Sequence, residues 1–493
     1  MEFLNKLFKL EDRGTKVSTE LVAGLTTFLA MAYILPVNAG MLSKVDGLTF
    51  GGVFIATALA AGLASIVMGL LANLPVALAP GIGLNAFFTY TLVFQMGLSA
   101  QAALAAVLVS GILFFIISVT GLRKLVISSI PGGLKFAVGA GIGFFITFIG
   151  LKNAGIIVAN GATFVALGNL SHPTVLLGVF GILLVFVLHA KGIRFALIIS
   201  IFATAILGLL LGLIFPDALM VTSNFQLGDW ATYNGSVFTT FTNESAEFFS
   251  MPKYIASPLG DAFSEFGSIF GIAFKGFGEL FSSWSAIGII FALLFVDFFD
   301  TAGTLMAVGH QAGLIDEDGE IIGSEKALLV DSIGTMSGAI LGTSNVTSYI
   351  ESATGIEQGG RTGMTSVVVG VLFILSILTF PLLSVVTGVE VSKDIFGDGI
   401  FYSPVTAMAL VLVGALMVRQ LKEIDWTDAA IVIPAFLTII FMLLTFSIAT
   451  GIAVGFIFYP LVKLAQGKAK DVNIVMYVLS VLFIIYFIVG TTQ

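Results

Sequence analysis

Charged residues are scarce in this sequence. Only 10% of its 493 residues are Asp, Glu, Lys or Arg, and 58% are hydrophobic, whereas an ordinary soluble domain carries about 25% charged residues. The mean hydropathy of +1.09 agrees with that balance. So few charges cannot cover a soluble globular surface, which excludes that class and leaves a lipid bilayer as the solvent. Any charge that lies inside the membrane then becomes a candidate for function.

Cysteine and histidine are also absent or rare. The chain has no cysteine and three histidines, which excludes disulfides and thiol metal sites and disfavours a His-rich metal site. We therefore expect no metal or cofactor, and no enzymatic activity, because the sequence holds no metal or nucleophile cluster. The net charge of −8 gives no support for a nucleic-acid partner. Glycine is abundant, at 56 residues, which suits close packing and broken helices in membranes.

Long apolar runs occupy most of the chain. A membrane-spanning helix needs about 20 mostly apolar residues. Runs of this kind predict spans at 18–37, 51–72, 100–120, 131–151, 174–190, 193–214, 285–308, 325–341, 362–386, 401–418, 428–446 and 449–465. A further apolar stretch, 473–490, fits either an extra span or an interfacial helix.

Two other segments look like interrupted spans. Residues 73–95 carry two prolines and two glycines in their first half, and residues 343–361 begin with small polar and β-branched residues. We expect each to be a short extended piece followed by a half-helix, with the second half-helix opening at Glu351. Irregular backbone at membrane depth must be buried in protein or line a cavity. Matching broken segments in two halves therefore point to a transporter binding site.

The chain shows weak internal similarity at an offset of 272 residues. This offset superposes both broken segments and lays the first span over 290–309; it aligns Gly62 with Gly334, Ser65 with Ser337, Asn73 with Asn345, and Gly83 with Gly355. It predicts two repeats of seven segments, the second inverted relative to the first. With a cytoplasmic N-terminus, 16 Lys and Arg fall inside and 5 outside, which obeys the positive-inside rule. We expect a multi-pass protein of the plasma (inner) membrane.

The longest predicted loop lies outside the membrane and contains a regular row of phenylalanines. They follow helical spacing at Phe263, Phe266, Phe270, Phe274, Phe277 and Phe281, with polar residues between them. Two interpretations remain open: a helix in the membrane interface, or a helix packed on the outer ends of the spans.

Buried acids and one amide are the candidates for chemistry. Asp297, Asp300 and Thr304 share one face of a predicted span, and a carboxylate inside the membrane costs about 3 kcal/mol on insertion scales. Glu351 stands at the start of a half-helix, where free N–H groups and the helix dipole can hold a carboxylate or a polar ligand. Asn85 is the strongly polar residue of the other half-helix. Each also has a structural interpretation, as a cap, brace or bridge between the broken segments.

Asp331 is a further acid in a predicted span. It lies near the start of span 325–341, where we expect a structural partner such as Lys326 or Arg361.

Four stretches together resemble the nucleobase–cation symporter superfamily, and in particular its AzgA-like branch of purine permeases. They are TELVAGLTTFLAMAYILPVN at 19–38, APGIGLNAFFTYT at 79–91, FVDFFDTAGTL at 295–305 and ESATGIEQGGRTGMTS at 351–366. Some uracil and xanthine relatives have two residues between the acid or amide and a glycine, whereas three residues separate Glu351 from Gly355 here, which suits the AzgA-like branch.

The resemblance implies an all-α polytopic membrane protein with 14 transmembrane segments as 7+7 inverted repeats. Segments 3 and 10 would each be a short strand plus a half-helix. A core domain would comprise 1–125 and 285–388, and a gate domain 126–215 and 389–470. Between and after them lie an extracellular loop, 216–284, and a C-terminal hydrophobic segment, 471–493. Relatives often pair through their gate domains, so a homodimer is an expectation of the same kind.

The resemblance also implies proton-coupled uptake of adenine, guanine or hypoxanthine. The expected binding residues are Asn85, Asp300, Glu351, Phe28, Ala86, Phe87, Thr304, Ala353 and Thr354, and the candidates for proton coupling are Asp300, Glu351 and Asp297. The base would lie between the two half-helices, with one carboxylate accepting its ring N–H groups. Protonation of another would remove a buried charge and let the loaded core domain move.

Other functions remain as alternatives. A xanthine or uracil symporter, or a sulfate or bicarbonate carrier, could share the architecture, although two facing acids would repel an anion. A passive channel is less compatible with broken helices in an inverted repeat, which favour alternating access.

Overall fold

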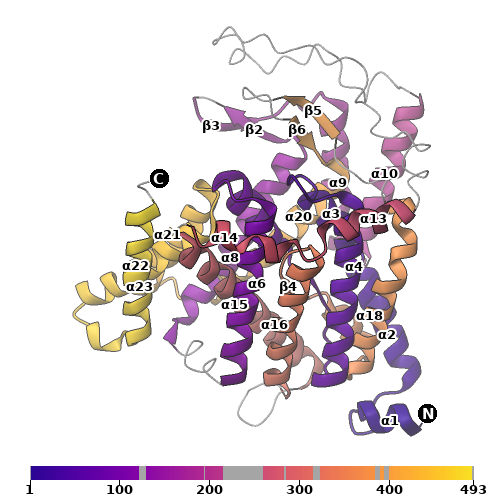
Figure 1. The fold of residues 1–493 in the computed structure, drawn as a ribbon, viewed down its shortest axis with the longest axis horizontal. Coiled ribbons are helices and arrows are strands. Elements are labelled where there is room, and N and C mark those ends of the chain that lie inside the picture. The colour runs from indigo at the N-terminus through magenta and orange to yellow at the C-terminus, as the bar shows by residue number, and fades with distance from the viewer. Residues whose placement is uncertain are drawn as a thin grey trace. The chain divides into compact units, whose positions relative to one another are not determined.

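A computed structural model describes residues 2–120, 129–160, 162–193, 195–214, 259–282, 285–314, 322–383, 389–393 and 399–490. Most of the predicted loop 216–284, and the basic residues Arg123, Lys124, Arg194 and Lys253 that entered the charge count, lie outside these ranges. The described chain is mostly helical (Figure 1). It forms two compact units: residues 1–145, 262–377 and 414–493 make one, and residues 146–261 and 378–413 make the other.

The first unit contains most of the helices. Its main helices are α1 (Glu2–Phe8), α2 (Val17–Met31), α3 (Ile34–Leu42), α4 (Phe50–Val67), α6 (Ala100–Thr120), α15 (Ser285–Ala312), α16 (Ser324–Leu341), α18 (Gly363–Leu375), α21 (Ala429–Leu444), α22 (Ile448–Ala465) and α23 (Ile474–Gly490). Most of α8 (Gly132–Asn153) also belongs to it. Residues 414–493 belong to this unit, although residues up to 470 were predicted to be part of the gate domain. The two compact units therefore have different boundaries from the predicted core and gate domains. The division into core and gate stays a prediction.

The second unit combines helices with two short strand pairs. Its helices are α9 (Pro173–Ala190), α10 (Ala196–Ile214) and most of α20 (Pro404–Met417). Strand β2 (Ile157–Asn160) pairs with β3 (Phe164–Leu167), and β5 (Val389–Lys393) pairs with β6 (Gly399–Tyr402), both antiparallel. The sequence prediction missed these pairs, because it placed only apolar spans and left the connections 152–173 and 387–400 unassigned, where nearly all of these strand residues lie. The fold is therefore mostly helical rather than all-helical.

Eight helices of the described chain are long and apolar enough to cross a membrane. Four shorter apolar helices lie at Ala196–Gly208, Gly363–Thr379, Ala429–Leu444 and Ile474–Ile485. The predicted span 18–37 is interrupted, since α2 ends at Met31 and α3 begins at Ile34. A membrane-spanning protein that is mostly helical is thus confirmed.

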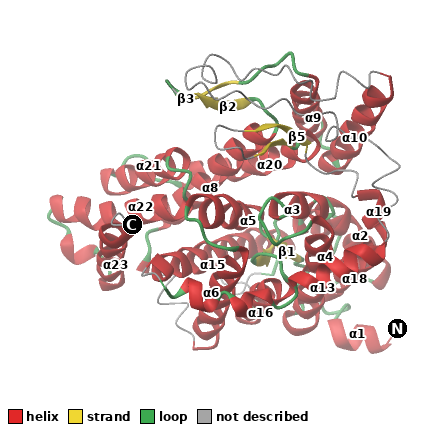
Figure 2. Ribbon diagram, turned by 45° about the horizontal axis from the view of Figure 1, so that its top comes forward, coloured by secondary structure: helices red, strands yellow, loops and turns green. Residues whose placement is uncertain are grey.

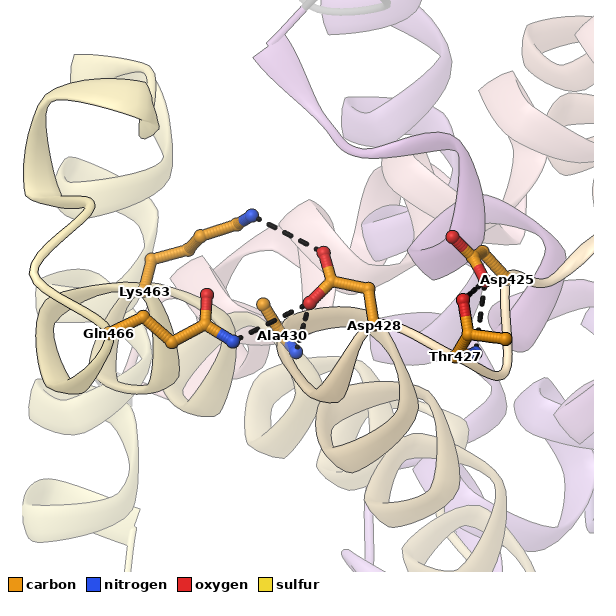
Figure 3. Close-up of polar contacts among 6 residues, drawn as sticks. All are labelled: Asp425, Thr427, Asp428, Ala430, Lys463 and Gln466. Carbon is orange, nitrogen blue, oxygen red and sulfur yellow. Dashed lines mark hydrogen bonds and ion pairs between the residues drawn. The ribbon is translucent and has the colours of Figure 1, made fainter.

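Side-chain caps fix the starts of several helices. Thr49, Thr362 and Ser447 each accept a backbone N–H from the first turn of the helix that they precede. Asp428 does the same for α21, accepting the N–H of Ala430 at 2.9 Å, and its other oxygen lies 3.5 Å from the Lys463 ammonium (Figure 3). The Ala430 N–H, helped by Lys463, holds the pKa of Asp428 below its usual range. These caps satisfy donors that a helix start leaves free.

Glycines let α18 approach α4 and the π-helical turn η1 (Met68–Ala72) that follows it. A side chain on Gly363 would clash with the backbone oxygen of Gly69 in η1, and one on Gly370 with that of Gly62 in α4. Small residues at such crossings are typical of helix packing in membranes, where close van der Waals contact replaces the hydrophobic effect. This packing brings the helices that flank the two broken segments together.

The two broken segments have the predicted local structure. In the first, β1 (Leu78–Pro80) leads into α5 (Ile82–Ala86) and then a π-helical stretch, η2 (Phe87–Gln95). In the second, β4 (Val346–Ser348) leads into α17 (Ser352–Glu357). The strands pair antiparallel, with Ala79 opposite Thr347, and Figure 2 shows β1 surrounded by helices of the first unit. The short strand plus half-helix is confirmed in both places.

Candidate functional site

Backbone and hydroxyl contacts fasten the two broken segments to each other. The N–H of Gly81 donates to the Asn345 carbonyl at 3.1 Å, and the N–H of Tyr349 donates to the Ala77 carbonyl at 2.9 Å. The hydroxyl of Ser352 accepts the N–H of Ala77 at 3.0 Å. Non-helical backbone at membrane depth is tolerated only when such groups are paired. The paired strands β1 and β4 therefore hold the starts of the two half-helices next to each other.

Glu351 lies at the start of the second half-helix. It is the residue preceding α17, as the sequence predicts, and its side chain is partly exposed. Its Oε1 accepts the Tyr33 hydroxyl at 2.7 Å, and Tyr33 directly precedes α3, at the break that follows α2. A residue from the first part of the chain therefore orients the acid of the second broken segment.

Asn85 lies in the first half-helix and is completely buried. Its Nδ2 donates to Asn38 Oδ1 at 2.6 Å. The amide nitrogen of Asn38 donates in turn to the hydroxyls of Thr57 and Thr343, at 2.7 and 2.8 Å. This chain of bonds links α5 through α3 to the residues that precede β4. Asn85 Oδ1 has no hydrogen-bond partner within the described part of the chain, so it remains an available acceptor.

Asp297 braces the second broken segment. Its Oδ2 accepts the Thr335 hydroxyl at 2.6 Å and the Asn345 amide at 3.2 Å. The carboxylate is buried, and its Oδ1 has no partner among the described residues. The structural interpretation of this acid fits these contacts, although the unpaired oxygen also keeps it among the candidates for proton coupling.

Asp331 has different partners from those that the sequence suggested. Its Oδ2 accepts the Thr301 hydroxyl at 2.6 Å and its Oδ1 the Ser348 hydroxyl at 3.1 Å. The expected pairing with Lys326 or Arg361 is wrong, because Asp331 turns toward β4 and α15, while the Arg361 guanidinium donates to the carbonyls of Ile356 and Gly360. The position of Asp331 along its span could not show which face of the helix meets the broken segment.

Asp300 differs from its two acidic neighbours. It lies one turn beyond Asp297 on α15, which packs against both α17 and β4. Asp300 and Glu351 are both partly exposed, whereas Asp297 and Asp331 are buried. Binding of a ligand by Asp300 and Glu351 stays a prediction.

The remaining predicted binding residues differ in burial. Ala86 and Phe87 are completely buried, whereas Thr304, Ala353 and Thr354 are partly exposed. The Phe28 ring is partly exposed and meets the Phe373 ring edge-on, with centroids 5.2 Å apart. Their contact with a ligand stays a prediction.

Sequence reasoning missed the residues that orient the site. Tyr33, Asn38 and Asn345 hold Glu351, Asn85 and Asp297 respectively. One signal was available for the first two, because they flank a proline in an otherwise apolar predicted span (YILPVN, 33–38). Asn345 aligns with Asn73 in the internal repeat, but that match carries no information about a partner.

The arrangement suits a neutral, flat ligand that donates and accepts hydrogen bonds. Carboxylates accept N–H groups, and the amide acceptor and the half-helix N-termini add polar groups of both kinds. An anion would face repulsion from two acids. Among the described residues, no group of three or more His, Asp or Glu is placed to hold a metal ion.

Comparison with known proteins gives matches along the whole chain. A sequence model described as a permease family matches residues 18–389. The guanine/hypoxanthine permease PbuG of Bacillus subtilis is 42% identical and the adenine permease AdeP of Escherichia coli 39% identical, each over 98% of this chain and 99% and 95% of theirs. A putative permease of Methanocaldococcus jannaschii is 43% identical over 99% of both chains.

Solved structures of similar fold have little sequence similarity. The transmembrane domain of the cyanobacterial bicarbonate transporter BicA has a TM-score of 0.54 at 14% identity, covering 88% of this chain and 97% of that one. The murine anion transporter Slc26a9 in its inward-facing state has a TM-score of 0.54 at 12% identity, covering 94% and 72%. These matches show a common fold.

Proposed function

This chain belongs to the permease family, in the purine permease branch that its motifs resemble, and from that premise we propose that it takes up adenine, guanine or hypoxanthine with protons. The protein is a transporter and not an enzyme. The observation that carries the proposal is the pair of half-helix starts at the β1–β4 junction, with the Asp300 and Glu351 carboxylates beside them.

The proposed binding mode follows from the hydrogen-bonding groups of a purine. A purine ring presents N–H donors and ring-nitrogen acceptors on its edges. Glu351, already oriented by Tyr33, would accept a ring N–H, and the free oxygen of Asn85 could accept a second. Phe28 would contribute contact with the ring face. Recognition by oriented donors and acceptors discriminates strongly, because a wrong base leaves buried polar groups unpaired.

Proton coupling would use the acid that does not bind the base. Asp300 and Glu351 are the first candidates and Asp297 the third. Moving a buried charge across the bilayer is costly. A proton bound to this acid would neutralise its charge and so lower the energy barrier for movement of the core domain. Coupling therefore makes uptake depend on the proton gradient, and no bound cofactor is needed.

We further propose fourteen transmembrane segments in two inverted repeats. The eight long apolar helices, three of the shorter ones (Ala196–Gly208, Gly363–Thr379 and Ala429–Leu444), the less apolar α16 and the two broken segments follow the chain order of this arrangement. Transport would occur by alternating access, with a core domain (1–125 and 285–388) moving against a gate domain (126–215 and 389–470). The protein would lie in the plasma membrane with a cytoplasmic N-terminus, and two copies would pair through their gate domains.

The solved structures of this fold raise a second function. They belong to bicarbonate and anion transporters, but a site with two open carboxylates disfavours an anion. A xanthine or uracil symporter is the remaining alternative within the family, and substrate competition separates it from a purine permease.

Uptake into proteoliposomes tests the proposal. Purified protein would be reconstituted with an inward proton gradient, and uptake of radiolabelled adenine and hypoxanthine measured against a panel of purines, pyrimidines, sulfate and bicarbonate. We expect competition by purines alone and loss of accumulation with a protonophore. Competition by uracil or by anions would refute the substrate class, and uptake that is indifferent to the protonophore would refute the coupling.

A further inference from the structure

A segment of the first unit crosses the ends of three long helices. It consists of α13 (Leu259–Ile269), the 3-10 helix η3 (Ile272–Lys275) and α14 (Phe277–Leu280), and residues 259–281 are called the strap below. In Figure 1 it runs across the upper ends of α6, α16 and α4. The proposed transport mechanism makes no use of it.

Acidic side chains of the strap cap the helices beneath it. Glu265 accepts the N–H of Gly52, in the first turn of α4, at 3.2 Å. Glu279 accepts the N–H of Ser99, which directly precedes α6, at 2.8 Å. Negative charge at a helix start is favourable, because free N–H groups and the positive end of the dipole lie there. The strap is thus bound through specific polar contacts.

The strap also lies directly against the backbone of these helices. A Cβ added to Gly51 would lie 3.1 Å from the Cα of Ala262, and one on Gly342 would lie 3.0 Å from the Ile269 carbonyl oxygen. A side chain on Gly276 would clash with the backbone of Gln101. Contacts this close leave no room for lipid or water between the strap and the helices, so its inner face is occupied by the protein itself.

Three faces of the strap can be distinguished. The inner face is buried and consists of Ala262, Ile269, Ile272, Ala273 and Leu280. Four large rings are exposed along the strap and are together called its phenylalanine face: Phe263, Phe270, Phe274 and Phe281 are 48, 54, 57 and 58% exposed. On α13, Asp261 and Ser268 are also exposed, and helical spacing places them roughly 160° and 140° around the helix from Phe263.

Helix α4 shows which side of the membrane the strap occupies. Its first turn contacts Glu265, while Asn73, beyond its other end, donates to the Phe8 carbonyl in α1 at 2.9 Å. The strap and the N-terminal helix therefore lie at opposite ends of a membrane span. With a cytoplasmic N-terminus, the strap faces the outer leaflet.

We propose that the phenylalanine face of the strap inserts into the phospholipid bilayer at its interface. The division into a protein face, an apolar face and a polar face opposite the rings is that of a helix lying in the membrane plane. The strap touches the very ends of α4, α6 and α16, which is the level where the hydrocarbon region begins. Farther along the same helices, α4 and α6 also expose apolar side chains, for example Leu63 at 47% and Ile116 at 46% exposure.

The charge of the strap indicates how it would bind lipid. It contains three acids, Asp261, Glu265 and Glu279, and one base, Lys275. Insertion would therefore depend on apolar burial and not on attraction to anionic headgroups, and it should occur in zwitterionic phosphatidylcholine and be insensitive to salt.

Site-directed spin labelling tests this inference. The chain has no cysteine, so a single cysteine introduced at Phe270 or Phe274 is the only attachment point for a nitroxide. Ser268→Cys, on the polar face of the same strap, is the matched control. The variants would be placed in phosphatidylcholine nanodiscs, and collision of each label with oxygen, which enters lipid, would be compared with collision with a water-soluble nickel chelate.

The expected result is a reversal between the two faces. Labels at Phe270 and Phe274 should collide with oxygen and be protected from nickel, whereas the label at Ser268 should collide with nickel, at low and high salt alike. Nickel access at Phe270 and Phe274 equal to that at Ser268 would overturn the inference. Protection from both reagents would also overturn it, since protein, either another part of this chain or a second copy, would then cover the rings. If a variant misfolds, Phe263→Cys and Phe281→Cys report on the same face.

Discussion

The two broken segments share a backbone plan but differ in chemistry. Each has a three-residue strand followed by a short helix. The first contributes a neutral amide, Asn85, whereas the second has Glu351 at its helix start and the carboxylates of Asp297 and Asp331 bound around its strand. The comparison shows that both segments supply a short strand and a helix start, while the acids bound around the junction of β1 and β4 come from the second half of the chain.

The largest expected effect is on the charged side of this comparison. Glu351→Gln keeps the shape of the side chain but removes its charge and its capacity to take up a proton, so uptake of adenine and hypoxanthine should be abolished, and Asp300→Asn should do the same. Uptake into proteoliposomes, normalised to protein content, measures this. Glu357→Gln, an exposed position on the same half-helix, is the control and should keep uptake. Wild-type uptake in both Glu351→Gln and Asp300→Asn would refute the site.

Tyr33→Phe tests whether the first half orients the acid of the second. It removes the hydroxyl that donates to Glu351, and a hydrogen bond to a charged group contributes about 1.5–3 kcal/mol. Uptake at low substrate concentration should therefore fall roughly 13- to 160-fold. Wild-type uptake in Tyr33→Phe at low substrate concentration would show that the hydroxyl does not position Glu351 for transport.

The neutral side should show a smaller loss. Asn85→Ala removes a neutral hydrogen bond to Asn38 and one acceptor for the base, and such a bond contributes about 0.5–1.5 kcal/mol. We expect the KM for purines to rise roughly 2- to 13-fold. Thr89→Val is the matched control, because the buried Thr89 hydroxyl has no partner among the described residues. A complete loss in Asn85→Ala would remove the distinction between the two segments.

The smallest effect concerns a region that belongs to neither segment. Asp428→Ala removes the cap of α21 (Figure 3) and should lower the free energy of unfolding by about 1 kcal/mol, with uptake unchanged. Asp428→Asn retains a capping oxygen and is the control. Because the pKa of Asp428 is lowered in the folded state, the cap is fully present above its unfolded pKa of about 3.9. The difference in free energy of unfolding between Asp428→Ala and the wild type should therefore be constant between neutral pH and about pH 4, and should shrink below about pH 4. Thermal unfolding in detergent measures this difference.

Composition and periodicity predicted that the protein lies in a lipid bilayer, that it is mostly helical, and where both broken segments occur. The half-helix start at Glu351 followed from local signals: β-branched residues before it and a helical pattern after it. The partners of Asp331 could not be predicted in this way. They depend on how α16 rotates against β4 and α15, and that rotation is set by contacts between residues far apart in sequence.

The same limit explains why the orienting residues were missed. Tyr33 and Glu351 are 318 positions apart, and no local pattern in 33–38 indicates which acid the hydroxyl meets. The phenylalanine row was predicted only in part. Its helical spacing predicted a single helix from Phe263 to Phe281, but α13 ends at Ile269 and is followed by η3 and α14, because Gly271 has a left-handed backbone that breaks the helix. Both interpretations of its surroundings contribute, because buried residues of the segment pack on the helix ends and four rings are exposed.

The antiparallel pair of β1 and β4 has a consequence for biosynthesis. Leu78 pairs with Ser348, so the first strand leaves the ribosome about 270 residues before its partner. At roughly 5–20 residues per second it waits on the order of 15–50 s. During that time its unpaired N–H and C=O groups must be shielded from lipid by the insertion machinery or by water. Completion of the proposed substrate site is therefore a late event in the maturation of the protein, and truncated chains that lack the second half should be targets for membrane quality control.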